Sequence, residues 1–386
     1  MPDILNGMLS EICFFSVGDS KNVSTFSGIP FFFSRELENR GVVVNRVNIA
    51  PPVLLSRVFN ALVKRVVHLF NPHSLYDFSR SWLYDVYVRR CIIKANKKYP
   101  NSELALFVTF CANNRTSTPN VLLGDWTFEY LKKVRSEHGT DLLENIYIRR
   151  ENKYIEKADL VITLFPHCEI FLDSKFPNIN VKYLGVNVVN NYNHNPIDEK
   201  QLICNKKLRK KILFIGRSYY QEGLNLLIDA FDVLRKRGLD LELHIVGFEK
   251  HELAPKIHDN MFVYGYLRKD VDEERDMYYK LLSEASMCVN PTSKWAGYSS
   301  MIEAMYYYTP IITSPYNDFV KEFGEAIEFG CYYDGTVNLA SLMLEILNRS
   351  DEEYMKMCKI AHKMVATHTW GHYVDLFLAE IEQLKK

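Results

Sequence analysis

The sequence of 386 residues lacks the features that define several large protein classes. Its 47 basic and 47 acidic residues cancel, so no overall charge attracts the chain to nucleic acid. No apolar run approaches the roughly 18 residues that span a bilayer, and the N-terminal stretch lacks the basic segment of a signal peptide. No Gly-x-Gly-x-x-Gly motif follows a predicted strand, which argues against a nicotinamide-dependent dehydrogenase.

Cysteine is sparse and dispersed. The eight cysteines stand singly between Cys13 and Cys358, with no Cys-x-x-Cys pair and no cysteine–histidine spacing typical of zinc. In a chain of this length they are expected to be reduced, mostly buried thiols of a cytosolic protein. The predicted location is therefore the cytoplasm, or the inner face of a membrane that the chain does not cross.

The first half of the chain alternates short apolar runs with helical stretches. Glu11–Val17 is a candidate strand, and the helix predicted over Pro30–Arg40 has proline in its first turn and Gly41 just past its end. Further candidate strands are Val42–Ile49, Ala105–Phe110, Asn120–Leu123 and Leu160–Leu164. Continuous apolar strands separated by helices are typical of a parallel α/β sheet.

The second half repeats this alternation more clearly. Strands are expected at Lys210–Ile215, Leu241–Val246, Met261–Tyr264 and Met287–Asn290, with helices over Leu224–Arg237 and Asp272–Glu284. The stretch Asn190–Lys207 is polar, contains Pro196 and lacks periodicity, so it is the predicted linker. Two successive α/β units predict two Rossmann-like domains with a ligand cleft at the carboxyl ends of their strands.

Several sequence pieces follow one another in a specific order. They are ILFIGR (212–217), LHIVG (243–247), VYGYL (263–267), CVNPTSKWAGYSSMIEAM (288–305) and TPIITS (309–314). Through them the segment from Lys210 to about Gly330 resembles the donor-binding domain of family-four retaining glycosyltransferases of the GT-B fold. The first half matches more loosely, through SGIPFFFSRELENRG (27–41) and KYIEKADLVITL (153–164). The ending, TWGHYVDLFLAEIEQL, is similar to the family's final helix.

The resemblance implies a GT-B fold, α/β with two Rossmann-like parallel-sheet domains facing a cleft. The expected parts are an acceptor-side domain over 1–195, a nucleotide-sugar domain over 208–368 and a crossover helix over 369–386 that packs on the first domain. The implied activity is a hexosyltransferase that takes a nucleotide-diphosphate sugar as substrate, with no cofactor and no metal. A glycan or lipid-linked oligosaccharide of surface polysaccharide synthesis is the implied acceptor.

Two charged residues carry the donor-site hypothesis. Arg217 directly follows a predicted buried strand, and its planar guanidinium suits diphosphate oxygens, although a surface arginine is the plain alternative. Glu303 lies at the start of the predicted helix IEAMYYY, and in the family this glutamate binds the nucleotide ribose. A carboxylate can accept hydrogen bonds from both hydroxyls of the ribose. Because Ser300 and Glu303 also show the spacing of a capping box, a purely structural role is the alternative.

The other donor-binding candidates offer backbone groups. Gly28 follows the first strand, where bare backbone can approach a phosphate or sugar, although glycines after strands often simply form turns. Ser299 and Ser300 begin a predicted helix, and their N–H groups suit phosphate or sugar. Gly216, Tyr266 and Leu267 complete the donor-binding set from the matching pieces.

The catalytic candidates are Arg217 and Asp125. In retaining enzymes of this type the leaving phosphate oxygen is thought to deprotonate the acceptor, so electrostatic stabilisation, here from Arg217, carries much of the rate. Asp125, after the strand NVLLG, is the candidate that faces the sugar, and an N-cap for the helix Phe128–Arg135 is its alternative. Asp270 and Asp272 match a metal signature of another glycosyltransferase fold, but they are expected to lie in a solvated first helical turn.

Three departures from the family pattern keep other functions open. Glu222 stands where the family usually has a second diphosphate-binding lysine, and Tyr308 stands where a glycine precedes the Thr-Pro pair. The stretch 294–298 is one residue shorter than in the family and lacks an acid that often contacts the donor sugar. Lys294 in this stretch could supply the positive charge that is missing at Glu222. A non-catalytic binding subunit of a glycan-assembly complex and a sugar-nucleotide epimerase are the alternatives.

The segment 57–98 is basic and aromatic. It has nine lysines and arginines against two aspartates, and Phe59, Leu62, Val63, Val66 and Phe70 are predicted to share one helical face. Phe78, Trp82, Tyr84 and Tyr87 follow. This pattern predicts either an interfacial helix on anionic lipid or an ordinary amphipathic core helix.

Overall fold

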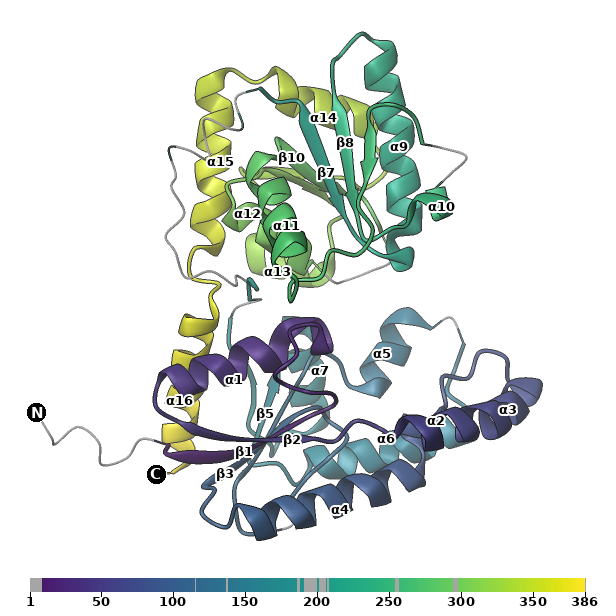
Figure 1. Ribbon diagram of the computed structural model, residues 1–386, viewed down its shortest axis with the longest axis vertical. Helices are drawn as coiled ribbons and strands as arrows, with labels where there is room; N and C mark the ends of the chain where they lie inside the picture. The colour runs from purple at the N-terminus through teal and green to yellow at the C-terminus, as the bar shows by residue number, and fades with distance from the viewer. Residues whose placement is uncertain are drawn as a thin grey trace, which may run out of the picture. The chain divides into compact units, whose positions relative to one another are not determined.

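The computed structural model describes residues 9–114, 116–136, 138–185, 188–190, 200, 206, 208–253, 257–293 and 298–385. The chain forms two compact units, and Figure 1 shows their elements coloured by residue number. The first, here unit 1, consists of Met1–Val186 and Trp370–Lys386, and the second, unit 2, of Asn187–Thr369. The predicted linker, Asn190–Lys207, lies almost entirely outside the described residues. Over those residues, no helix combines the length and apolar character needed to cross a bilayer.

Unit 1 is built on a six-stranded sheet in the order β2-β1-β3-β4-β5-β6, with every neighbouring pair parallel. The strands are β1 Glu11–Ser16, β2 Val43–Asn48, β3 Leu104–Val108, β4 Asn120–Gly124, β5 Leu160–Thr163 and β6 Val181–Tyr183. Every residue of β3, β4 and β5 is buried. Helices therefore cover both faces of these strands, which is why they consist of continuous apolar residues.

The main helices of unit 1 include one from the far end of the chain. They are α1 Ile29–Asn39, α4 Trp82–Lys98, α5 Phe128–Arg135, α6 Leu142–Ile155, α7 Pro166–Lys175 and α16 Trp370–Leu384. Figure 1 shows α16 beside α1, and the contacts between these two helices agree with the picture. The ring of Phe33 on α1 meets Trp370, Tyr373 and Phe377 at centroid distances of 5.0–5.9 Å. Arg40, just past α1, reinforces the contact through an ion pair with Asp375, 2.7 Å between Nε and Oδ1.

Unit 2 holds a second parallel six-stranded sheet, in the order β12-β11-β10-β7-β8-β9. Its strands are β7 Lys211–Ile215, β8 Glu242–Val246, β9 Met261–Val263, β10 Met287–Asn290, β11 Ile311–Thr313 and β12 Gly330–Tyr332. Its helices are α9 Gln221–Lys236, α10 Lys250–Leu253, α11 Asp272–Glu284, α12 Ser299–Tyr306, α13 Asn317–Phe323, α14 Leu339–Asn348 and α15 Asp351–Val365. Because all strands are parallel, the loops that follow them leave one edge of the sheet.

The predicted parallel α/β architecture is confirmed in both units. α11 and β10 have the predicted bounds, and α9 begins three residues before the predicted start because Gln221 and Glu222 join its first turn. The seven described cysteines are all free thiols, and four of them, including Cys13 and Cys358, are buried.

Candidate functional site

The predicted donor-binding residues of unit 2 follow its strands at the carboxyl edge of the sheet. Gly216 and Arg217 come directly after β7, Tyr266 and Leu267 come shortly after β9, and α12 follows β10. Strands β7 and β10 are hydrogen-bonded neighbours, with Met287 opposite Ile212. The loop that carries Arg217 and the loop that leads into α12 therefore leave adjacent strands at the same edge.

Arg217 is exposed and stacks on a second predicted residue. Its Cζ lies 4.3 Å from the centroid of the Tyr266 ring, which is itself 47% exposed. A guanidinium held over the face of an aromatic ring is attracted by the ring and can still donate its N–H groups to an anion. The structure thus brings together two of the predicted donor-binding residues, one from the β7 loop and one from the β9 loop.

The β7 loop is held in place by close backbone packing. Gly247, after β8, has a φ of +99°, and a Cβ at this position would lie 2.1 Å from the carbonyl oxygen of Gly216. The amide of Gly216 donates to the carbonyl of Val246, and the amide of Gly247 donates to the carbonyl of Gly265, at 3.0 and 2.7 Å. Glycine at 247 therefore allows three consecutive loops to pack against one another beside Arg217.

Helix α12 begins at Ser299, as predicted for the two serines, but the capping-box interpretation of Ser300 and Glu303 is wrong. Its N-cap is Tyr298, which makes no side-chain capping hydrogen bond, and Ser299 is the first helical residue. Glu303 is therefore the fifth residue of α12, too far along to return to the cap. The predicted Ser299 and Ser300 do lie in the first turn, where backbone N–H groups without an intrahelical acceptor favour an anion.

Glu303 is buried and both of its carboxylate oxygens are engaged. It is 5% exposed, and its Oε1 accepts a hydrogen bond from Lys269 Nζ at 2.8 Å. Oε2 accepts a hydrogen bond from the Tyr278 hydroxyl. Burial, reinforced by the nearby Glu303 charge, raises the pKa of Tyr278 well above its ordinary value, so the phenol stays protonated and donates. A buried carboxylate in this setting is a charged, oriented acceptor.

Lys269 and Tyr278 were not among the predicted site residues. They lie 34 and 25 residues before Glu303 in the sequence, and no spacing rule connects them with it. A third group that was missed follows β11. The side-chain oxygens of Thr313, Ser314 and Tyr316 are buried and find no hydrogen-bond partner among the described residues. Buried polar atoms of this kind are rare in folded proteins, and these stand at the same edge of the sheet.

The structure describes two of the three positions that depart from the family pattern, Glu222 and Tyr308. Glu222 is an exposed residue in the first turn of α9. Lys294 and the three residues after it lie outside the described part of the chain. Tyr308, at the usual glycine position, has the left-handed φ of +59° that glycine adopts readily. Its ring stacks on His362, with centroids 4.1 Å apart.

Gly28 and Asp125 belong to unit 1, at the carboxyl edge of its sheet. Gly28 is buried, has a φ of +84° and is the N-cap of α1. Asp125 follows β4, and the N-cap of α5 is Thr127 instead, whose side chain accepts from Tyr130 N. The alternative role of Asp125 as a helix cap is therefore wrong. Burial raises the pKa of the Asp125 carboxyl, partly offset by a hydrogen bond from the Trp126 amide, 3.0 Å long.

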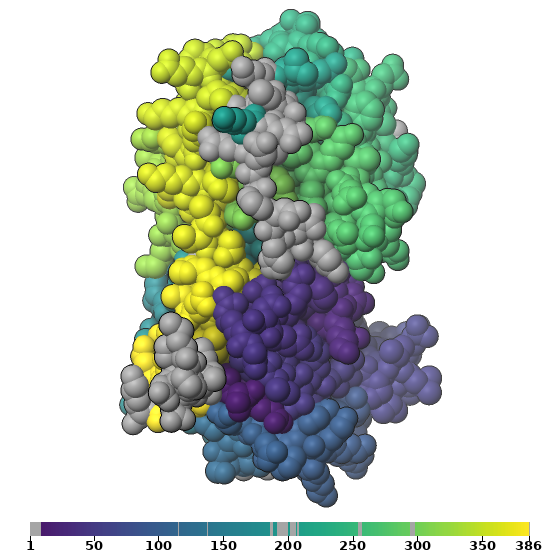
Figure 2. All heavy atoms as spheres, turned by 60° about the vertical axis from the view of Figure 1, so that its left-hand side comes forward, coloured from purple at the N-terminus to yellow at the C-terminus, as the bar shows by residue number. Residues whose placement is uncertain are grey.

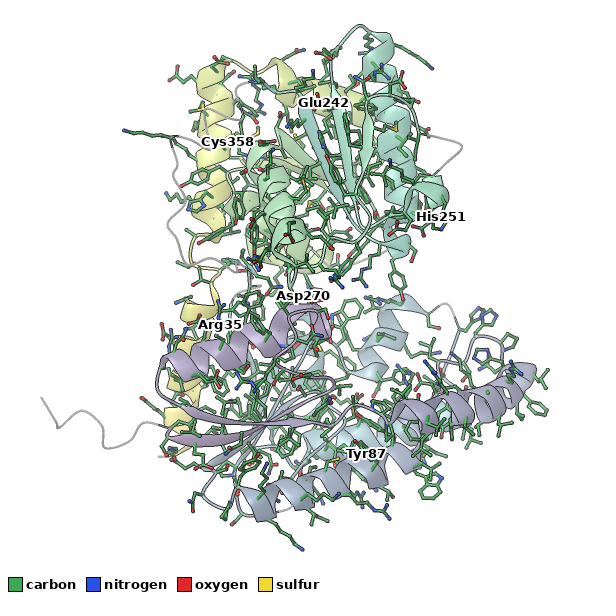
Figure 3. The ribbon with its side chains drawn as sticks, in the orientation of Figure 1. Arg35, Tyr87, Glu242, His251, Asp270 and Cys358 are labelled. Carbon is green, nitrogen blue, oxygen red and sulfur yellow. The ribbon has the colours of Figure 1, made fainter. Side chains whose placement is uncertain are left out.

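The beginning of the basic segment 57–98 lies in a helical projection, residues 53–70, with an exposed apolar face. It consists of α2 Val53–Phe59, a π-helical turn Asn60–Lys64 and α3 Arg65–Phe70, and it projects from the rest of unit 1 in Figures 1 and 2. Eight large apolar side chains of the projection are 51–88% exposed, and six of these are here called the apolar stripe. They are Leu54, Val58, Leu62, Val66, Leu69 and Phe70. In Figure 3 side chains extend outward along these helices.

The predicted composition of this face is only partly correct. Leu62, Val66 and Phe70 are exposed as a group, but Phe59 points inward, with its ring centroid 5.5 Å from that of Phe78. Of the aromatic residues that follow, Phe78 and Tyr84 are buried in the core, whereas Trp82 is 64% exposed. The π-helical turn, which adds a residue to one turn, changes which side chains align, and the sequence alone did not predict it.

Asp270 and Asp272 lie where the loop after β9 meets α11, and Asp272 is the first residue of that helix. Figure 3 labels Asp270 in this loop. Asp272 pairs with Arg275 within the helix, 2.9 Å between Oδ1 and Nη2. Over the described ranges, no cluster of three or more histidine, cysteine, aspartate or glutamate residues could hold a metal ion.

Comparison with known proteins identifies the second half of the chain. Residues 209–348 match the family of glycosyl transferases group 1. Unit 2 is a group 1 glycosyltransferase domain. The match spans β7 to α14 of this glycosyltransferase domain and includes Arg217, Tyr266 and Glu303. The enzyme class predicted from the sequence, a glycosyltransferase, is thereby confirmed. No curated protein sequence matched the chain.

Solved structures share the fold across nearly the whole chain. Sucrose-phosphate synthase from Thermosynechococcus elongatus is 17% identical, with a TM-score of 0.67 over 97% of this chain and 98% of that one. WaaG, a glycosyltransferase involved in lipopolysaccharide biosynthesis, is 12% identical, with a TM-score of 0.60 over 93% and 95%. Anabaena HepE, in complex with UDP and glucose, is 12% identical, with a TM-score of 0.58 over 97% and 99%. The predicted GT-B fold is confirmed.

Proposed function

We propose that this glycosyltransferase moves a hexosyl or deoxyhexosyl unit from a UDP- or GDP-sugar to a glycan or lipid-linked oligosaccharide, with retention of configuration. Surface polysaccharide synthesis is the proposed setting. Two similar structures support the donor and the acceptor classes, since HepE was solved with UDP and glucose and WaaG is involved in lipopolysaccharide biosynthesis. No resident metal or cofactor is part of the proposal.

One arrangement carries the proposal. Exposed Arg217, the uncapped start of α12 and the buried Glu303 carboxylate all follow strands at the carboxyl edge of one parallel sheet. The guanidinium and the helix N-terminus are the positive groups that a diphosphate leaving group needs as its charge develops. A carboxylate in the same domain accepts hydrogen bonds from ribose hydroxyls. Gly216, Tyr266 and Leu267 would complete the donor-binding surface.

In the proposed reaction the donor phosphate oxygen removes the proton from the acceptor hydroxyl as the glycosidic bond to the diphosphate breaks. The sugar then bonds to the acceptor oxygen on the face that the diphosphate leaves. Arg217 stabilises the departing diphosphate. Because the phosphate oxygen takes the proton, the chain need not supply a base.

Calorimetric titration with UDP, GDP, ADP and dTDP-rhamnose tests the donor site. Wild type is expected to bind one of them at micromolar concentration. Glu303→Ala is expected to weaken that binding by about 1.5–3 kcal/mol, the range for hydrogen bonds to a charged group. Glu325→Ala, an exposed acid of the same unit, is the matched control. Absence of binding to all four would favour the non-catalytic subunit, whereas product formed from a donor without acceptor would favour an epimerase.

The same proposal includes an anionic membrane surface as partner, through the projection 53–70. The apolar stripe is too exposed to belong to the core, and the projection has no acidic residue but contains Arg57, Lys64 and Arg65. A hollow of about 540 Å³ beside Lys64 and Arg65 offers these two cations to an anionic headgroup. An apolar face flanked by cations favours the boundary between lipid headgroups and acyl chains. The enzyme would thus be cytoplasmic and peripheral on the membrane.

A further inference from the structure

The loop between β9 and α11 places a lysine against the carboxylate proposed to bind ribose. Lys269 Nζ lies 2.8 Å from Glu303 Oε1 and 4.4 Å from the centroid of the Tyr278 ring. The Tyr278 hydroxyl donates to the other oxygen, Oε2. Two donors from separate elements thus fix the plane of the carboxylate, one from a loop and one from helix α11.

Lys269 is itself anchored by the helix that follows it. Arg275 Nη1 donates to the backbone carbonyl of Lys269 at 3.4 Å, and Glu274 accepts from the Arg268 amide at 2.6 Å. The Lys269 side chain remains 19% exposed, whereas that of Glu303 is 6% exposed. The Lys269 side chain, in the loop that begins with Tyr266 and Leu267, is therefore more accessible to solvent than the carboxylate that it contacts.

The hydrogen-bonding capacity of Glu303 is only half used. Each carboxylate oxygen has about two acceptor positions, and Lys269 and Tyr278 occupy one on each. With the partners found among the described residues, one position on each oxygen is left, which is the number that a vicinal diol requires. The Lys269 ammonium also offsets the cost of keeping Glu303 ionised away from bulk water. Without it the carboxylate would be a poorer and less oriented acceptor.

We propose that Lys269 and Tyr278 are positioning residues that orient Glu303 for both hydroxyls of the donor ribose and so determine selection of ribonucleotides over 2′-deoxyribonucleotides. The inference rests on the proposed function, because it concerns the same donor site. It adds two residues that neither the family match nor the sequence pattern assigns to that site.

The test is calorimetric titration with UDP and 2′-deoxy-UDP, and with GDP and 2′-deoxy-GDP. Wild type is expected to bind the ribonucleotide at least about tenfold more tightly, one hydrogen bond to a charged group being lost in the deoxy ligand. Tyr278→Phe and Lys269→Met are expected to bring this ratio to within about threefold of one, mainly by weakening the ribonucleotide. Lys280→Met, an exposed lysine on α11, is expected to keep the wild-type ratio.

The outcomes separate the inference from the function on which it rests. A wild-type ratio retained in folded Tyr278→Phe and Lys269→Met would overturn the positioning role and leave nucleotide binding intact. A wild type that binds neither nucleotide pair would overturn both. Lys269→Met leaves a buried carboxylate without its cation and can unfold unit 2. Tyr278→Phe, which removes one oxygen atom and keeps the ring, then decides the question alone.

Discussion

The guanidinium carbon of Arg217 lies over the ring of Tyr266, with Cζ 4.3 Å from the ring centroid. The two residues are 49 positions apart and come from the loops after β7 and β9. Their contact links the proposed diphosphate-binding residue to the loop that also carries Lys269. The stack orients the guanidinium edge without using its N–H groups, which leaves them for phosphate oxygens.

Removing the Tyr266 ring is expected to weaken diphosphate binding. Tyr266→Leu should lower the affinity for UDP about two- to fivefold, since a cation–π contact at an exposed site contributes roughly 0.5–1 kcal/mol, and Arg217→Ala should lower it further. Calorimetry with UDP and with uridine measures the difference. Tyr266→Phe keeps the ring and should behave as wild type. Equal losses for UDP and uridine would instead mean that the ring contacts the nucleoside.

The apolar stripe is expected to determine membrane binding. Leu62→Asp with Val66→Asp should lower partition into vesicles of phosphatidylglycerol and phosphatidylcholine at least tenfold, because two large exposed apolar side chains no longer enter the interface. Vesicle flotation measures the bound fraction. Val337→Asp, at an exposed valine of unit 2, should change nothing.

Charge reversal provides an independent test of the lipid surface. Lys64→Glu with Arg65→Glu should weaken binding to anionic vesicles by roughly 1 kcal/mol or more for each residue, and wild-type binding should weaken with salt. If neither the aspartate pair nor the glutamate pair changes partition into vesicles, the apolar stripe does not bind the membrane.

Gly247 is expected to tolerate no side chain. Gly247→Ala would place a Cβ 2.1 Å from the Gly216 carbonyl oxygen, at a φ of +99°. Overpacking of this kind costs roughly 1–3 kcal/mol, and it also displaces the residue before Arg217. Thermal unfolding should show a transition several degrees lower, and UDP binding should weaken with it. Gly139→Ala, where open space surrounds the added Cβ, should match wild type.

Glu151 is expected to make unit 1 less stable as the pH rises from about 4.5 to 7. Burial raises the pKa of Glu151 to about 7, although the Phe128 amide donates to it at 2.8 Å. Between its ordinary pKa and this value the folded state binds more protons than the unfolded state. The free energy of unfolding therefore falls with rising pH, by at most about 1.4 kcal/mol per unit, and levels off above 7.

Denaturant unfolding of wild type and Glu151→Gln at several pH values tests this dependence. Glutamine cannot ionise, so the difference in unfolding free energy between the two proteins should change across this window. Glu156→Gln, an exposed position at the end of α6, is the control. Parallel pH profiles for all three proteins would contradict the prediction.

The sequence predicted best what local pattern determines. Buried strands such as β4 and β10 are runs of apolar residues, and their order along the chain implies a parallel sheet. Arg217 was found because it directly follows such a strand. The partners of Glu303 were not found, since Lys269 and Tyr278 reach it only through tertiary packing. Phe59 was assigned to the wrong face because a regular helical period does not allow for the π-helical turn that follows it.

The position of α16 has a consequence for the order in which the protein can be completed during synthesis. Phe33 and Arg40, near the start of the chain, make their contacts with Trp370, Tyr373, Asp375 and Phe377. The ribosome translates all of unit 2 before these partners exist. The apolar surface of α1 therefore stays without its α16 partners while unit 2 is synthesised. Unit 1 is the first to be started and the last to be completed.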